Sequence, residues 1–181
     1  MQNLLAAHLS LFIGHTEANL ASYDITPTDC IETICKDNRS ACMKVSASTV
    51  RHFARLAGRA QAPRYMRFLR SITNPMGSAI TRNQDMVISA LAEHQEAVLL
   101  YEGEEGREER QERIDADELQ SNPRGKLAYH IELVALLASA VAGKNQVVES
   151  RVRDIVSLDE LMDQLLYCLQ PSAGSIGAPT G

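Results

Sequence analysis

Apolar side chains recur at intervals of three and four residues along most of this chain, which is the period of an α-helix buried on one side. The clearest case is the set Tyr65, Phe68, Leu69 and Ile72, at positions i, i+3, i+4 and i+7. Only residues 98–100, Val-Leu-Leu, have the character of a strand, and they are too few to build a sheet. We therefore predict an all-α fold.

Local signals indicate where several helices begin. Thr26 followed by Pro27 is typical of an N-cap and first helical residue, and Ser46 or Ser48 can cap the helix after it. The segments 81–84 (Thr-Arg-Asn-Gln) and 157–160 (Ser-Leu-Asp-Glu) both fit a capping box, in which the first and fourth residues bond to each other's backbone.

The most apolar segment is Leu127–Ala142, which we expect to form a central, buried helix. Its 16 residues include His130 and Glu132, so it does not meet the requirement of roughly 20 mostly apolar residues for a membrane span. Helices of this kind, joined by short turns and without heptads, favour an armadillo-like helical solenoid of stacked helical hairpins. No self-similarity at a period of roughly 40 residues accompanies them, so this expectation depends on helix lengths alone.

The 181 residues suit one domain, which we place at residues 1–170. Within it, the acidic and polar stretch 102–124 is expected to be an exposed loop or a surface helix with a solvated face. Residues 171–181 (PSAGSIGAPTG) lack any core-forming pattern and are expected to be a disordered tail.

Charge is distributed unevenly along the chain. Residues 38–84 hold nine basic side chains and no acid, whereas residues 85–118 hold twelve acids and three arginines. The net charges of the two blocks, +9 and −9, cancel. The formal net charge of the whole chain, −5, is too small to argue for a polyanionic partner. Such asymmetry bears on partners rather than on the fold.

The basic block contains one candidate interaction face. Arg51, Arg55 and Arg59 lie at i, i+4 and i+8, opposite the apolar stripe, and Arg64 and Arg67 continue the positive charge on the next helix. Three interpretations of this face are open. It is a solvated surface, or it is an interface for an acidic protein segment of this chain or of another, or it binds a phosphate ligand or nucleic acid. Nucleic acid is the least favoured of these, because no RRM, zinc-finger or KH pattern occurs.

Patterns that would indicate an enzyme are missing. The sequence has no HExxH, P-loop or GxSxG motif, and His130-Ile131-Glu132 matches only half of a zinc deaminase signature. Cys30, Cys35 and Cys42 with His52 fit no common zinc spacing, and free thiols are expected. We predict no catalytic activity, metal or cofactor, and keep a zinc or thiol enzyme only as the least favoured alternative.

Several blocks, in order along the chain, resemble the RIH domain shared by inositol 1,4,5-trisphosphate receptors and ryanodine receptors, and more closely the former. The main block is 129–138 (YHIELVALLA), followed by 143–145 (GKN) and 158–161 (LDEL). Earlier blocks are listed here in chain order: Asn3-Leu4-Leu5, His52-Phe53, 65–69 (YMRFL) with Ile72, and 83–87 (NQDMV). The resemblance extends over residues 2–166 and departs from the family pattern in the acidic stretch 102–124.

The resemblance implies an α-helical module in the cytosolic part of a tetrameric calcium release channel, on the cytosolic face of an intracellular calcium store such as the endoplasmic reticulum. Such a module relays conformational change between ligand-binding and pore regions, and its partners are other cytosolic domains of the same channel. Neither the pore nor the inositol phosphate pocket lies in this chain, and no membrane insertion is expected. The chain is then expected to be a fragment of a channel. The alternative is a stand-alone helical-repeat binding module that uses the basic face at residues 51–70.

Overall fold

The computed structural model describes residues 2–5, 8–14, 26–99, 101–159 and 161–162, and every regular element among them is helical. The all-α prediction is confirmed. In chain order the elements are α1 (Gln2–Leu5), α2 (Leu9–Gly14), α3 (Pro27–Cys35), α4 (Arg39–Cys42), α5 (Ala47–Ala60), α6 (Pro63–Thr73), α7 (Thr81–Glu93), α8 (Gly103–Asp115), α9 (Glu118–Ser121), α10 (Lys126–Ala140) and α11 (Gln146–Ile155), with short 3-10 turns at Pro75–Gly77 and Gln95–Ala97.

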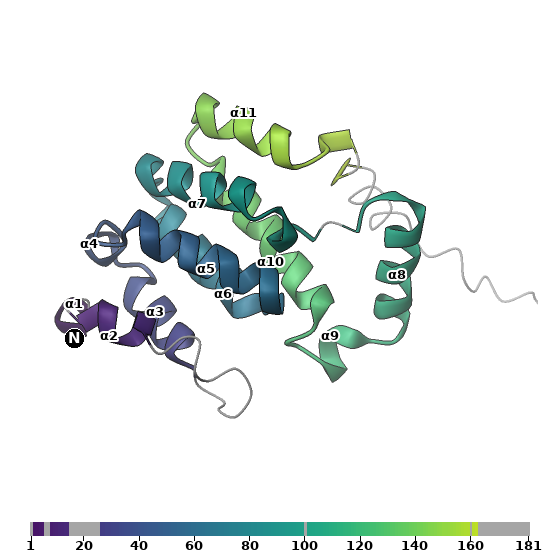
Figure 1. Ribbon diagram of the computed structural model, residues 1–181, viewed down its shortest axis with the longest axis horizontal. Helices are drawn as coiled ribbons and strands as arrows, with labels where there is room; N and C mark the ends of the chain where they lie inside the picture. The colour runs from purple at the N-terminus through teal and green to yellow at the C-terminus, as the bar shows by residue number, and fades with distance from the viewer. Residues whose placement is uncertain (1, 6–7, 15–25, 100, 160, 163–181) are drawn as a thin grey trace, which may run out of the picture.

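Helix α6 lies at the centre of the packing. It contacts α3 on one side and α10 on another, and it forms a hairpin with α5 through a two-residue turn at Gln61 and Ala62. Helix α7 packs on α5 and α6, α11 packs on α7, and α8 stands apart at one end (Figure 1). This side-by-side packing of helices is consistent with a helical repeat.

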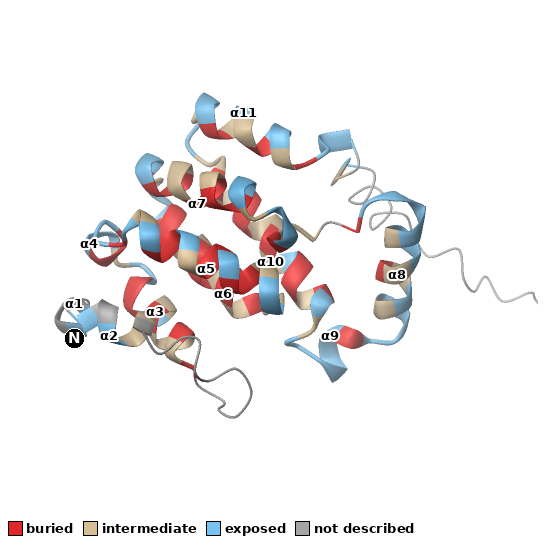
Figure 2. Cartoon of the chain, viewed as in Figure 1, coloured by how far each residue is buried: buried red, intermediate tan, exposed pale blue. Residues whose placement is uncertain are grey.

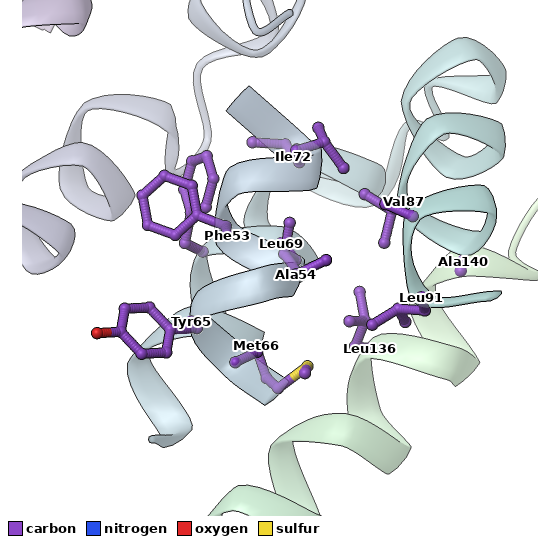
Figure 3. Packing of buried hydrophobic residues seen from close by; sticks show 14 of the residues in the cluster. Phe53, Ala54, Tyr65, Met66, Leu69, Ile72, Val87, Leu91, Leu136 and Ala140 are labelled. Carbon is purple, nitrogen blue, oxygen red and sulfur yellow. The ribbon is translucent and has the colours of Figure 1, made fainter. Parts of the chain in front are cut away.

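The core is formed by the apolar stripes that the sequence predicts. The ring centroids of Phe53 of α5 and Phe68 of α6 lie 4.3 Å apart. Leu69 of α6 and Leu136 of α10 lie in the same cluster, together with Leu91 of α7 (Figure 3). Full burial of each such side chain stabilises the fold by about 1.5–3 kcal/mol.

Two of the predicted helix starts are confirmed. The Thr26 side chain accepts a hydrogen bond from the Asp29 backbone N–H, and Asp29 bonds back to Thr26, with Pro27 as the first helical residue. At α5 the cap is Ser46, whose hydroxyl oxygen accepts from the Thr49 N–H, rather than Ser48.

The predicted capping box at residues 81–84 is wrong. Helix α7 begins at Thr81, its N-cap is Ile80, and no side chain bonds to the cap. Gln84 is fully buried, and its amide nitrogen donates instead to the carbonyls of Ser139 and Ala142, at 3.3 and 2.8 Å. A buried amide must find partners, and the open carbonyls at the end of α10 provide them. In the second predicted box, Leu158 and Asp159 are helical, but Glu160 lies outside the described residues.

Helix α10 packs in the interior, as expected for the segment 127–142, but only one side of the helix is buried. Tyr129 and Leu133 are fully buried, whereas Ile131 is 46% exposed. The acidic stretch is a surface helix rather than a loop, because Gly103–Asp115 form α8. The predicted tail at 171–181 lies outside the described residues. No helix in the described part of the chain is both long and apolar enough to span a membrane.

Candidate interaction surface

Arg51, Arg55 and Arg59 form a row on the outer side of α5, and we call these three residues the α5 row. All three side chains are exposed, while Phe53 and Ala57 on the opposite side of the helix are fully buried. Figure 2 shows exposed and buried residues alternating along α5. Within the described part of the chain, Arg51 and Arg59 have no hydrogen-bond or ion-pair partner. A guanidinium N–H of Arg55 donates to Nδ1 of His52 at 3.1 Å.

The two predicted arginines of α6 do not extend this row. Arg67 is half-buried and forms ion pairs with Asp29 and Glu32 of α3, at 3.4 and 3.3 Å. The guanidinium of Arg64 lies over the ring of Tyr65, 5.1 Å from its centroid. The five candidate residues therefore divide into an outward row on α5 and a pair whose contacts lie within the fold.

Arg64 and Arg67 line a small depression of about 120 Å³ beside Asp29 and Arg124. Partial burial would raise the pKa of Asp29, but two hydrogen bonds from Thr26 and the charges of Arg67 and Arg64 outweigh it, and the pKa is lower than usual. Asp29 is therefore a carboxylate at neutral pH, and it balances part of the positive charge around it.

A further ion pair of α6, between Arg70 and Glu132, was not predicted from the sequence. The guanidinium of Arg70 lies 3.2 Å from a carboxylate oxygen of Glu132 on α10. Desolvation raises the pKa of Glu132, and the positive charges of Arg70 and Arg67 oppose that rise. The sequence signal for this contact was a lone acid within the apolar segment 127–142, but no pattern indicated its partner.

Buried polar side chains tie further helices together. The amide nitrogen of Asn83 on α7 donates to the carbonyls of Cys42 and Ile72, at the ends of α4 and α6. The hydroxyls of Thr73 and Ser139 lie 2.7 Å apart and join α6 to α10. These bonds and the two arginine contacts make α3, α4, α6, α7 and α10 a connected network.

The residues considered for chemistry do not converge. His130 lies 2.9 Å from the backbone carbonyl of Leu99 through its Nδ1, whereas Glu132 points to Arg70. The Sγ of Cys42 bonds to the carbonyl of Cys35. Across the residues that the structure describes, no three His, Cys, Asp or Glu side chains are grouped as metal ligands would be.

An acidic counterpart to the α5 row lies on α8. Glu104, Glu108 and Glu112 are exposed and share the spacing i, i+4 and i+8; we call these three residues the α8 ridge. The inner side of α8 is held by Arg113, which donates to Glu109 at 2.6 Å and to Glu118 of α9 at 2.8 Å.

A family model of the RIH domain of ryanodine and inositol trisphosphate receptors matches residues 1–102 of the 181. The match includes α1 to α7, with the α5 row, and ends just before α8. The block 129–138 lies beyond it, and nothing in the match separates the two receptor types. The family is one of channels and not of enzymes. The match covers more than half of the chain, which therefore belongs to the RIH-domain family of intracellular calcium release channels.

Proposed function

We propose that the chain is an armadillo-like module of an inositol trisphosphate receptor-like channel, in the cytosolic part of a tetramer at the endoplasmic reticulum membrane or an equivalent calcium store. In this role it relays displacement between the ligand-binding and pore regions. The family match supports the channel, and the closer resemblance of the block 129–138 supports the receptor type.

The observation that carries the relay is the way α6 is held. Arg67 pairs with Asp29 and Glu32 of α3, and Arg70 pairs with Glu132 of α10, so one helix is bound to neighbours on two sides. Close-packed helices that share such contacts move together rather than deform, and they pass a displacement from one face of the module to another.

We also propose that the module continues beyond the matched residues, through residue 170. The core does not end at residue 102, since Leu136 of α10 packs in the same cluster as Leu69 of α6. Without α10, one side of α6 would lose its apolar cover.

The test uses the whole channel that contains this sequence. Arg70→Glu places two acids together at the α6–α10 contact, and it is expected to reduce ligand-evoked calcium release from microsomes while the ligand affinity stays unchanged. Arg153→Glu, at an exposed position of α11, is the matched control and should leave release unchanged. Release evoked by inositol trisphosphate rather than ryanodine would support the receptor type. Detection of the sequence only as a free polypeptide of about 20 kDa, away from membranes, would overturn the proposal.

One observation favours the second candidate, a stand-alone binding module: the α5 row is exposed. Because Arg67 and Arg70 form ion pairs with acids of the same chain, the binding surface of this second candidate would consist of α5 alone. Three arginines give a shallow salt dependence of binding to a polyanion, with a slope no steeper than about −3. Titration of heparin into the chain at several salt concentrations measures it.

A further inference from the structure

Met76 stands in a backbone conformation that methionine does not favour. It forms the tip of the 3-10 turn Pro75–Gly77, where its φ of 55° and ψ of 30° lie in the left-handed region. Glycine and asparagine adopt this region readily, whereas a methionine there costs the fold free energy. Burial of the side chain could offset that cost, but Met76 is 75% exposed. A residue that breaks a local rule without a gain inside the molecule is a candidate for a contact outside it.

A second exposed methionine lies on a neighbouring turn. Met43 follows α4 directly and is 48% exposed. Helix α4, at the left end of the molecule in Figure 1, lies against the turn Pro75–Gly77. A guanidinium N–H of Arg39 donates to the Ser78 hydroxyl at 2.9 Å. A guanidinium N–H of Arg82 donates to the Met43 carbonyl at 3.2 Å. Both methionines are therefore held at one edge of the fold.

Basic side chains surround the two methionines, and all of them are exposed: Arg39, Lys44, Arg82 and Lys144. Within the described part of the chain, none of the four forms an ion pair with an acid. The two arginines bond to carbonyl and hydroxyl oxygens, which are neutral and leave the positive charge in place. Residues 38–84 and 141–148 contain no acid, and Lys36 offsets Asp37 at the border of the first segment. We call Met43, Met76 and these four bases the turn edge.

Lys144 comes to the turn edge from the loop after α10. Its neighbour Gly143 lies against Ala79, since a Cβ built on the glycine would lie 3.1 Å from the Cβ of Ala79. The Ala79 carbonyl in turn accepts a hydrogen bond from Arg39 at 3.4 Å. The loops after α4, α6 and α10 thus meet here, and each presents its exposed residues at a turn. Protruding side chains of this kind differ from the well-packed pockets in which the anchors of protein interfaces lie.

We propose that the turn edge is a peripheral docking surface for an anionic lipid bilayer. Methionine side chains at the tips of turns can enter the boundary between headgroups and acyl chains, while the bases around them meet the lipid phosphates and carboxylates. Long basic side chains keep their charge at this level while their stems lie along apolar surface. The contact is peripheral and needs no helix that spans the membrane. This inference depends on the exposed turns and not on the channel assignment.

Cosedimentation of the full chain with unilamellar vesicles tests the contact. One set of vesicles is phosphatidylcholine alone, and the other contains about 30% phosphatidylserine, each at about 100 mM and about 500 mM salt. We expect binding to the anionic vesicles at the lower salt, and much weaker binding to neutral vesicles or at the higher salt, because salt screens the attraction. No binding to the anionic vesicles at the lower salt, or equal binding to both sets, would overturn the proposal.

Two variants separate the charges from the methionines. Lys44→Glu with Lys144→Glu should weaken binding by at least roughly tenfold, since each basic residue near an anionic surface strengthens binding about fivefold. Met43→Ser with Met76→Asn should weaken binding by at least roughly fivefold, because two apolar side chains no longer leave water. Met76→Asn alone should melt no lower than the unchanged chain, because asparagine suits the left-handed backbone at this position. A lower melting temperature would show that Met76 serves the fold, and would overturn the proposal.

The matched controls carry the same kinds of change on other exposed surfaces: Arg59→Glu with Arg153→Glu for charge, and Ile114→Ser with Leu119→Asn for apolar side chains. Both controls should bind the anionic vesicles like the unchanged chain. If the charge control loses as much binding as the lysine reversal, the attraction is one of overall charge and the proposal fails. It also fails if the methionine variant binds as tightly as the unchanged chain, because the bases then recognise any polyanion, such as an acidic protein segment, rather than a bilayer.

Discussion

The carboxylate of Glu132 and the guanidinium of Arg70 lie 3.2 Å apart, and they join the two central helices α10 and α6. The Glu132 side chain is 20% exposed and that of Arg70 is 40% exposed. The acid is therefore the more desolvated partner, which agrees with its raised pKa. Removing the arginine leaves a half-buried charge, whereas removing the acid leaves an arginine that can turn to water.

The first prediction follows from this asymmetry. Arg70→Met is expected to lower the free energy of unfolding by about 1–2 kcal/mol, and Glu132→Gln by about 1 kcal/mol or less. The double variant should cost less than the sum of the two, since the pair interacts directly. Urea unfolding followed by circular dichroism measures all three. Additive losses would show that the pair contributes nothing to the α6–α10 contact.

The second prediction concerns Asn83, which is fully buried and donates to the carbonyls of Cys42 and Ile72. Asn83→Ala removes both bonds. The Cys42 carbonyl keeps the bond from the Val45 N–H, at 3.2 Å, whereas the Ile72 carbonyl loses its Asn83 donor, and the expected cost is about 1–3 kcal/mol. Gln120→Ala, on the exposed side of α9, is the control and should change stability by no more than about 0.5 kcal/mol. Equal unfolding midpoints for the two variants would contradict the bridging role of Asn83.

The core could be predicted from the sequence because the pattern that indicates it, the spacing of apolar residues within one helix, involves only neighbouring residues of the chain. The stripe Tyr65, Phe68, Leu69 and Ile72 is buried as its spacing predicts, and Thr26 caps α3 through a residue three positions away. The capping motif at 81–84 failed for the opposite reason. Gln84 is drawn to carbonyls 55 and 58 residues away, and local spacing contains no information on such contacts.

For the five candidate arginines, helical period predicts exposure but not contacts with distant residues, and a binding role for the α5 row stays a prediction. Exposure of the α5 row follows from helical period, because its residues lie opposite the buried Phe53. The fate of Arg67 depends on Asp29 and Glu32, which are 38 and 35 residues earlier in the chain. Charge counting by segment does not reveal such pairs, since it treats every arginine of the basic block as equally available.

The third prediction is a pH dependence of stability caused by His130. Burial lowers the pKa of this side chain, against the smaller effect of its bond to Leu99. The carbonyl can only accept, so Nδ1 carries the proton of the neutral ring. The unfolded chain, with a histidine pKa of about 6.5, binds a proton more readily than the folded one. Stability should therefore fall as the pH drops from about 7 to about 5.

His130→Gln retains an amide donor for Leu99 and cannot titrate, so it isolates this effect. The difference in unfolding free energy between pH 7 and pH 5 should be smaller for the variant than for the unchanged chain. The other histidines and the carboxylates are common to both proteins, so their contributions cancel in the comparison. Identical pH profiles would mean that His130 is protonated equally well in both states.

The last prediction concerns the attachment of α8 to the body at Gly106. A Cβ built at this position would lie 2.5 Å from the backbone carbonyl carbon of Tyr101 and 2.7 Å from its oxygen. An exposed helical Gly→Ala change ordinarily stabilises by about 0.5–1 kcal/mol, but here the backbone of residue 101 would have to move. Gly106→Ala should therefore destabilise the chain by about 1–3 kcal/mol. Glu105→Ala, one position away on the exposed side, is expected to be close to neutral. Hydrogen exchange should show faster exchange throughout α8 for Gly106→Ala alone, because the clash pushes the first turn of that helix away from the segment that anchors it.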